Sequence, residues 1–250
     1  MLFNDQISIP SFFTYGYRLC IKLCGLNWTA PDYSTHCRRQ KHIDIAINYQ
    51  KSRDGLHLLV DSTGLKFLGE GEWKRKKYHP EYRRQWRKLN IGIDAETLQI
   101  RAVQLTTSHI SDSQVLGDLL NQIPLDEQID SVYTNGAYDT KQCRQVIADR
   151  QAYAVIPPRK NAKSWKDNKV HSRERNELLR TVKRFGRTLW KKWSGYHRRT
   201  LVETKMHCIK LLSDKFSARS FQSQVNEVHA RVAVLNKLTE LGRPHTQVVP

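Results

Sequence analysis

The sequence predicts a mixed α/β protein in which helices flank a sheet, and three observations lead to this prediction. A continuous apolar run, Leu58-Leu59-Val60, is followed by polar residues, which is typical of a buried strand. Two stretches of alternating apolar and polar residues, 89–93 and 99–105, predict a β-hairpin around residues 94–97. Farther along the chain, helical and extended stretches alternate, as expected for an α/β sheet.

The first predicted strand, residues 57–62, ends in an acidic residue, Asp61. A carboxylate at the end of a buried strand lies at the rim of the sheet, where α/β proteins often place their active sites. An equally good interpretation is an aspartate that caps the turn into Ser62-Thr63-Gly64. Before this strand the pattern is less regular, and residues 12–26 predict a short helix that ends at Gly25.

Capping residues and stop signals predict the elements that follow the hairpin. Ser111 and Thr140 are suited to cap helices, and Gly186 and Gly242 are suited to follow them. The predicted elements are helix 112–123, strand 131–134, helix 141–150, strand 153–156, helix 173–185, a helix that carries Glu203, and helix 221–241. A hairpin followed by alternating helices and strands is the order of a mixed sheet.

The charge balance indicates a polyanionic partner. The chain holds 42 Lys and Arg against 24 Asp and Glu, which gives a net charge of +18. Such an excess opposes compaction by self-repulsion, and it favours binding to nucleic acid first and to an anionic membrane surface second. No apolar run approaches the roughly 20 residues that span a bilayer. The five cysteines form no Cys-x-x-Cys pair and are interpreted as reduced thiols without a zinc site.

Two basic stretches with interleaved aromatic residues are candidate nucleic-acid contacts. Residues 73–88 include Trp86, Arg87 and Lys88 among further basic and aromatic residues. Arg and Lys bind phosphates, and Trp or Tyr can stack on an exposed base. Residues 159–195 form the second stretch, which is interpreted as either an insertion or a long extension before the next helix. A plain solvated loop is the alternative interpretation of the first stretch.

A helix over residues 196–210 would place four functional side chains on one face. At about 100° per residue, an aromatic ring, a guanidinium, a carboxylate and an ammonium group fall within about a sixth of the circumference. These residues are Tyr196, Arg199, Glu203 and Lys210. The alternative is an amphipathic surface helix whose polar face is only solvated.

Several blocks of the chain, taken together, resemble the DDE transposases of bacterial insertion sequences, in the group usually numbered five. The most specific block is a C-terminal signature of Tyr, two residues, Arg, three residues, Glu, six residues and Lys, which the four residues above match at every spacer. Further matching blocks are residues 60–66, 86–89, 136–140 and 156–162. The resemblance extends from about residue 28 to about residue 240, and it implies an RNase H-like fold.

The resemblance also implies a triad of two aspartates and one glutamate that binds divalent metal, Mg²⁺ or Mn²⁺ as its substitute. Asp61 matches the first acid and Glu203 the third. The family's second aspartate directly precedes Gly-Ala-Tyr-Asp, and in this chain that position is Asn135. Asp139 is a separate position of the family pattern and is not assigned to the triad. Because an amide brings no negative charge to the metals, we expect an impaired transposase.

The same resemblance implies supporting roles and boundaries. Tyr196, Arg199 and Lys210 are expected to support the catalytic acid and to contact DNA near the cut. Because the Pro31-Asp32-Tyr33 segment comes early, the chain is similar to an N-terminally truncated member of the family. The expected division is a remnant of a DNA-binding region at 1–56, an RNase H-like catalytic domain at 57–215 with a basic insertion at 159–195, and a C-terminal helix and tail at 216–250.

Three functions follow as hypotheses. The first is a transposase that hydrolyses and joins phosphodiesters at the element ends. The second is a non-catalytic DNA-binding remnant that regulates or joins intact transposase. The third is an RNase H-like nuclease that acts on RNA or structured DNA. In all the transposase-related hypotheses the partners are the element ends and the target DNA, with a homodimer on paired ends, no membrane, and a cytoplasmic, nucleoid-associated location.

Overall fold

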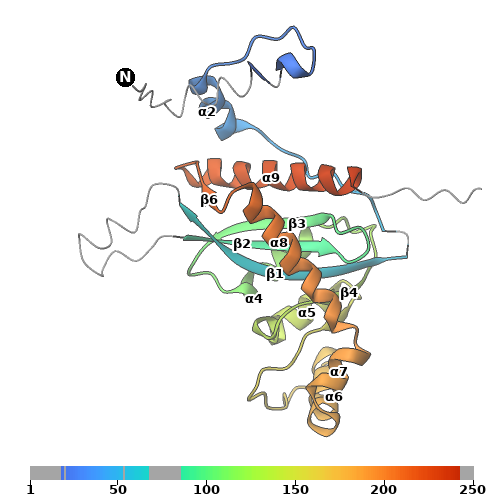
Figure 1. Cartoon of the computed structure of the whole chain (residues 1–250). Coiled ribbons are helices and arrows are strands. Elements are labelled where there is room, and N and C mark those ends of the chain that lie inside the picture. Colours follow the sequence, from blue (N-terminus) through green and yellow to red (C-terminus); the bar gives the residue numbers. More distant parts are fainter. Residues whose placement is uncertain (1–17, 20, 53, 68–85, 243–250) are drawn as a thin grey trace, which may run out of the picture.

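The computed structural model describes residues 18–19, 21–52, 54–67 and 86–242, and a six-stranded mixed sheet lies at its centre (Figure 1). The strands are β1 (Leu56–Phe67), β2 (Trp86–Asp94), β3 (Ile100–Thr107), β4 (Ile129–Tyr133), β5 (Tyr153–Val155) and β6 (Lys215–Phe216). The order across the sheet is β3-β2-β1-β4-β5, and β6 pairs with the end of β1. The pairs β1–β2 and β2–β3 are antiparallel, whereas β1–β4, β4–β5 and β1–β6 are parallel.

Helices cover both faces of this sheet. The helices are α2 (Tyr33–His42), α4 (Asp112–Asn121), α5 (Lys141–Asp149), α6 (Val170–Phe185), α7 (Arg187–Trp193), α8 (Thr200–Leu212) and α9 (Phe221–Leu241), with short 3₁₀ turns η1 (Gly136–Tyr138) and η2 (Tyr196–Arg199). The predicted α/β class is thereby confirmed, and the arrangement is that of an RNase H-like fold.

Two apolar cores hold the layers together. On one face, side chains of α8 and α9 such as Val202, Ile209 and Val232 pack on alternate residues of β1 and β2. On the other face, residues of α4 and α5 such as Leu116 and Ile147 pack on the opposite set of strand residues. Burying this apolar area on both faces is the main force that holds the helices to the sheet.

Strand β1 extends beyond its predicted end. Its pairing with β2 continues from Leu58 to Lys66, and β6 pairs with Lys66 and Phe67. Asp61 therefore lies within the strand, and the interpretation of a turn through Ser62-Thr63-Gly64 is wrong. The reason is that β2 offers backbone partners along this whole length, so polar residues that resemble a turn continue the ladder. The length of β1 therefore depends on its pairing with β2 and does not follow from the residues of β1 alone.

Other boundaries also differ from the sequence prediction. Trp86, Arg87 and Lys88 begin β2 instead of ending a loop, while residues 73–85 lie outside the described part of the chain. The predicted helix over residues 196–210 divides into the 3₁₀ turn η2 and the α-helix α8. Helix α6 begins at Val170, three residues before the predicted start. The predicted helices at 112–123, 141–150 and 221–241 correspond to α4, α5 and α9.

Helix α2 and the pair α6 and α7 lie at opposite ends of the fold (Figure 1). Helix α2 packs against α9, where Asn226 Nδ2 donates to Gln40 O at 2.7 Å. Residues 18–19 and 21–23 are helical and Gly25 follows with a φ of 66°, whereas residues 12–17 of the predicted short helix lie outside the described residues. Nowhere in the described part of the chain is a helix both long and apolar enough to cross a membrane.

Candidate active site

The first candidate acid, Asp61, lies on the sheet face that α8 covers. Side chains alternate between faces along a strand, and Leu59, two residues earlier, belongs to the core between the sheet and α8. Asp61 therefore points toward α8, and only 6% of its surface is exposed. Such burial of a carboxylate requires partners that satisfy its charge.

The second candidate position, Asn135, lies directly beside Asp61. Strand β4 is parallel to β1 with Tyr133 opposite Leu59, so the residue two places after Tyr133 reaches the level of Asp61. Asn135 Nδ2 donates to Asp61 Oδ1 at 3.1 Å, and Asn135 Oδ1 accepts from Ala137 N at 2.7 Å. This second bond caps the turn η1 and fixes the orientation of the amide, with its nitrogen toward Asp61.

The third acid, Glu203, is joined to Asp61 through Arg199. One guanidinium nitrogen of Arg199 donates to Asp61 Oδ2, and the other donates to Glu203 Oε1 at 2.9 Å. Arg199 ends η2 and Glu203 lies one turn later on α8, which is the spacing at which side chains on a helix meet. The Glu203 side chain is 55% exposed. The guanidinium thus occupies the place between the two carboxylates.

The electrostatics of Asp61 reflect this setting. Burial raises the pKa of the Asp61 carboxyl, and the negative charge of Glu203 raises it further. The Arg199 guanidinium and the hydrogen bonds from Ser62 and Asn135 act in the opposite direction, but burial has the larger effect on this pKa. Asp61 is therefore a carboxyl whose charged form depends on nearby cations.

Tyr196 lies beside this group, in hydrogen-bonding contact with Arg199, whereas Lys210 lies farther along α8. The Tyr196 ring lies 5.5 Å from the Trp190 ring centroid, and Lys191 Nζ lies 5.5 Å from the Tyr196 ring. Burial raises the pKa of the Tyr196 hydroxyl. Lys210 is half-buried on α8, two turns beyond Glu203, which is a rise of roughly 10 Å along the axis. Its predicted contact with DNA stays a prediction.

Three residues at the start of β2 are predicted to contact DNA, and they differ in how far contacts within the protein already engage them. Lys88 forms an ion pair with Asp112 at 3.0 Å and donates to Ile110 O. Arg87 lies over the Phe67 and Phe221 rings. Trp86 is 37% exposed and packs over Gly64, where an added Cβ would lie 3.1 Å from the ring. Trp86 is the most available of the three for a nucleic-acid contact.

The structure gives Asp139 a role that sequence reasoning missed. Its carboxylate pairs with Arg144 at 3.2 Å and with Arg175 at 3.0 Å, and it is almost fully buried. Asp139 therefore joins α5 and α6, and both of its carboxylate oxygens are engaged by arginines. Arg159 is a second such residue, because it donates to Gly136 O and Ala137 O at 3.1 and 3.0 Å and so supports the loop after Asn135.

The donor set does not fit a pair of divalent cations. Hard cations such as Mg²⁺ take oxygen ligands, yet N–H groups of Asn135 and Arg199 face both oxygens of Asp61. The oxygen of the Asn135 amide is committed to Ala137 N. Within the described residues, no group of three or more His, Cys, Asp or Glu side chains could hold a metal ion. In this arrangement Arg199 supplies the positive charge between the acids.

Comparison with protein families identifies the family of the chain. A family model described as a transposase DDE domain matches residues 52–237, a range that includes Asp61, Asn135 and Glu203. A second model with the same description matches residues 15–70. The first match covers about three quarters of the chain and spans all six strands of the sheet. The chain belongs to the DDE transposase family.

Proposed function

We propose that this chain is an insertion-sequence transposase, of the group usually numbered five, that binds DNA but is impaired in strand cutting and joining at Asn135. The observation that carries the proposal is the placement of Asn135. It lies at the level of Asp61 on the neighbouring parallel strand, where a second carboxylate would share a cation with Asp61, and it presents an amide nitrogen instead.

The chemistry explains why this single difference matters. In-line displacement at a phosphate benefits from two metals about 3.5–4 Å apart, one for the attacking oxygen and one for the leaving oxygen. Asp61 and Glu203 supply two carboxylates, and Arg199 already neutralises part of their charge. The binding of Mg²⁺ or Mn²⁺, on which the family's reaction depends, is therefore expected to be weak in this chain. Impairment comes from the chemistry and not from the fold, because Asn is nearly isosteric with Asp.

Retention of DNA binding follows from the distribution of charge. The net charge is +18, and many of the basic side chains in the 159–195 stretch are exposed. Exposed Lys and Arg bind phosphates without reading sequence. The partners that we propose are the element ends and the target DNA, bound by a homodimer near the nucleoid.

A second candidate function is a non-catalytic DNA-binding protein that occupies element ends or joins intact transposase. The Arg199 bridge favours it, because a guanidinium that donates to both acids neutralises part of their charge without metal. Mixing this chain with its Asn135→Asp variant tests the idea. If the unsubstituted chain lowers the nicking by a fixed amount of variant more than an equal amount of albumin does, it occupies the element ends or joins the variant; no such inhibition would exclude this function.

We expect binding to DNA without efficient cutting. Binding is measured on a labelled duplex that carries the DNA flanking the gene. A plot of the logarithm of the association constant against the logarithm of the salt concentration should have a slope of about −5 if some six phosphates are neutralised. Nicking in Mg²⁺ or Mn²⁺ should stay at the level of a metal-free control. Efficient nicking by the unsubstituted chain would show that Asn135 does not impair it, and a flat salt dependence would remove the phosphate-binding part of the proposal.

The Arg199→Lys variant should lower the stability of the metal-free protein by about 1–2 kcal/mol. A lysine keeps the charge, but its compact ammonium cannot donate along the two directions by which Arg199 reaches Asp61 and Glu203. Urea unfolding measures the change. The neighbouring exposed Arg198→Lys is the matched control and should leave the midpoint unchanged. Equal midpoints for both variants would mean that the bridge contributes nothing to stability.

A further inference from the structure

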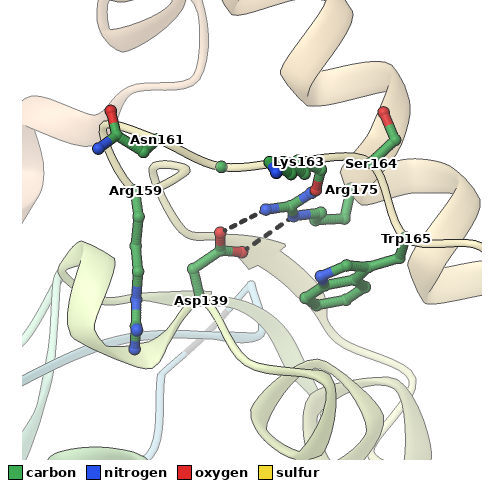
Figure 2. Close-up of a pocket in the computed structure, with 8 residues that line it drawn as sticks. Asp139, Arg159, Asn161, Lys163, Ser164, Trp165 and Arg175 are labelled. Atoms are coloured by element: carbon green, nitrogen blue, oxygen red, sulfur yellow. Dashed lines mark hydrogen bonds and ion pairs between the residues drawn. The ribbon is translucent and has the colours of Figure 1, made fainter.

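An open cavity of about 400 Å³ lies beside the candidate active site, between the loop after β5 and helix α6 (Figure 2). Its wall includes Arg159, Asn161, Lys163, Trp165 and Arg175, with Asp139 at its base. A water takes up roughly 30 Å³ in the liquid, so the cavity has room for about a dozen waters or for a phosphate with part of its sugar. None of these residues is a member of the proposed triad.

The charge at the base of this cavity is unbalanced. Asp139 is the acidic residue in the described lining, and Figure 2 shows the Arg175 guanidinium paired with it. Arg144 pairs with the same carboxylate from the other side, and both arginines are at most 3% exposed. One carboxylate therefore faces two buried guanidinium groups. A buried excess of positive charge is costly unless an anion compensates for it.

The rim adds positive charge and hydrogen-bond donors. Lys163 and Arg159 are exposed, and Asn161 and Ser164 bring an amide and a hydroxyl to the opening. Trp165 is stacked by the Arg175 guanidinium, which lies 4.5 Å from its ring centroid, so that face of the indole is covered by a cation. The rim is thus suited to an anion with several acceptor oxygens, such as a phosphate.

The cavity is joined to the loop that carries Asn135. Arg159 donates to the carbonyls of Gly136 and Ala137, the two residues that follow Asn135. Asp139 closes the same loop, because its backbone nitrogen donates to Gly136 O. A DNA strand whose scissile phosphate faces Asp61 would therefore bring a neighbouring phosphate toward the opening of the cavity.

We propose that this cavity binds a phosphodiester of the DNA strand next to the one that faces Asp61, with Lys163 and Arg159 at its rim and Arg175 at its base. The assignment rests on the proposed function, because it takes the strand at the Asp61 group as its reference. It adds a specific phosphate subsite to the general basic character of the 159–195 stretch, and it explains why one acid faces several cations there.

The test combines a side-chain change with a change in the DNA. Duplexes that carry one neutral methylphosphonate at successive linkages are titrated by fluorescence anisotropy. The proteins are the unsubstituted chain, Lys163→Gln and the control Lys166→Gln, an exposed lysine of the same stretch that is not part of the cavity lining. Lys163 is exposed and only its backbone carbonyl contacts Arg175, so the substitution leaves the Asp139 pairs in place.

The expected result is that the effects of Lys163→Gln and of the methylphosphonate are not additive at one linkage. Lys163→Gln should weaken binding to the unmodified duplex roughly three- to tenfold and reduce the salt slope by about one. At one linkage the methylphosphonate should weaken binding by the unsubstituted chain and by Lys166→Gln, but it should add no further loss in Lys163→Gln. This pattern would identify the phosphate that Lys163 contacts.

Other outcomes overturn the assignment. If the methylphosphonate weakens binding by Lys163→Gln as much as binding by the unsubstituted chain at every linkage, the cavity holds no DNA phosphate, while the proposed function stands. If inorganic phosphate raises the melting temperature of the unsubstituted chain but not of Lys163→Gln, and the two effects are additive at every linkage, the cavity binds a free anion instead. If none of the three proteins binds DNA, the proposed function itself fails.

Discussion

The Asn135→Asp variant should gain stability from Mn²⁺ or Mg²⁺, whereas the unsubstituted chain should not. One oxygen of the new carboxylate can still accept from Ala137 N, so the cap of η1 is kept. The other takes the place of Asn135 Nδ2, now 3.1 Å from Asp61 Oδ1. Two carboxylates at that separation repel each other unless a cation lies between them. The substitution therefore creates the oxygen-lined site that this chain lacks.

The expected size of the effect is large enough to measure by thermal unfolding. Without metal, the variant should lose about 1–3 kcal/mol, because a hydrogen bond is replaced by repulsion between like charges. A divalent cation at 100 times its dissociation constant should add about 2.7 kcal/mol, which is several degrees in melting temperature for a chain of this size. Strand nicking of flanking DNA should then appear in the variant with Mn²⁺ or Mg²⁺ and not in the parent chain.

Without metal, the loss of stability caused by Asn135→Asp should grow as the pH rises. The pKa of Asp61 is already raised by burial, and a second carboxylate beside it raises that pKa further. A carboxyl with a raised pKa in the folded state holds its proton more tightly there than in the unfolded state. The folded variant is therefore favoured at low pH, and it loses this advantage as the pH rises above the ordinary value of 3.8. Melting temperatures measured from about pH 4 to pH 7 should show the gap between parent and variant widening.

A remote exchange of the same kind serves as the control. Asn168→Asp makes the same chemical change at an exposed position after the cavity loop, and it should show neither the metal-free loss nor the gain with metal. If Mn²⁺ stabilises all three proteins equally, Asn135 does not occupy the position of the second acid. If the parent nicks DNA as fast as Asn135→Asp, the acids of the reaction lie elsewhere in the chain.

The sequence was most informative where the pattern was local and periodic. The apolar run at 58–60, the hairpin around 94–97 and the capped helices all depend on contacts between near neighbours, and each appears in the fold. The length of β1 depends on its partner β2, which is why Ser62-Thr63-Gly64 resembled a turn. Likewise, the 3₁₀ geometry of η2 changes how Tyr196 is placed relative to Glu203, and the periodicity of an α-helix does not show it.

The site was only partly predictable for a similar reason. Parallel pairing of β1 with β4 brings Asp61 and Asn135 together, and the order of the blocks in the sequence suggests this pairing. The direction of the Asn135 amide depends on its bond to Ala137 N, and the Arg199 bridge depends on where α8 crosses the sheet. The pairing of Asp139 with Arg175 joins residues 36 positions apart. The spacing of these two residues along the chain does not predict that contact.

Removing the Asp139 carboxylate should be the most destabilising of the changes considered. Asp139→Ala leaves Arg144 and Arg175 without their shared counter-ion, and both are almost completely buried. Breaking a buried pair in this way costs about 3–5 kcal/mol, because charge stays behind in a region without water. The loss should appear as a large fall in the urea midpoint, together with detachment of α6 from α5 in hydrogen exchange, since Asp139 is the anion that joins them.

The same residue separates a structural role from a catalytic one. Asp139→Asn keeps an acceptor for one arginine and should destabilise less than Asp139→Ala, while Asp126→Ala removes an exposed partner of Lys51 and should leave the midpoint unchanged. Combined with Asn135→Asp, Asp139→Asn should preserve stabilisation by Mn²⁺, because Asp139 contacts arginines and not Asp61. Loss of that stabilisation without loss of fold would instead make Asp139 a metal ligand, and the assignment of Asn135 to the second-acid position would then be wrong.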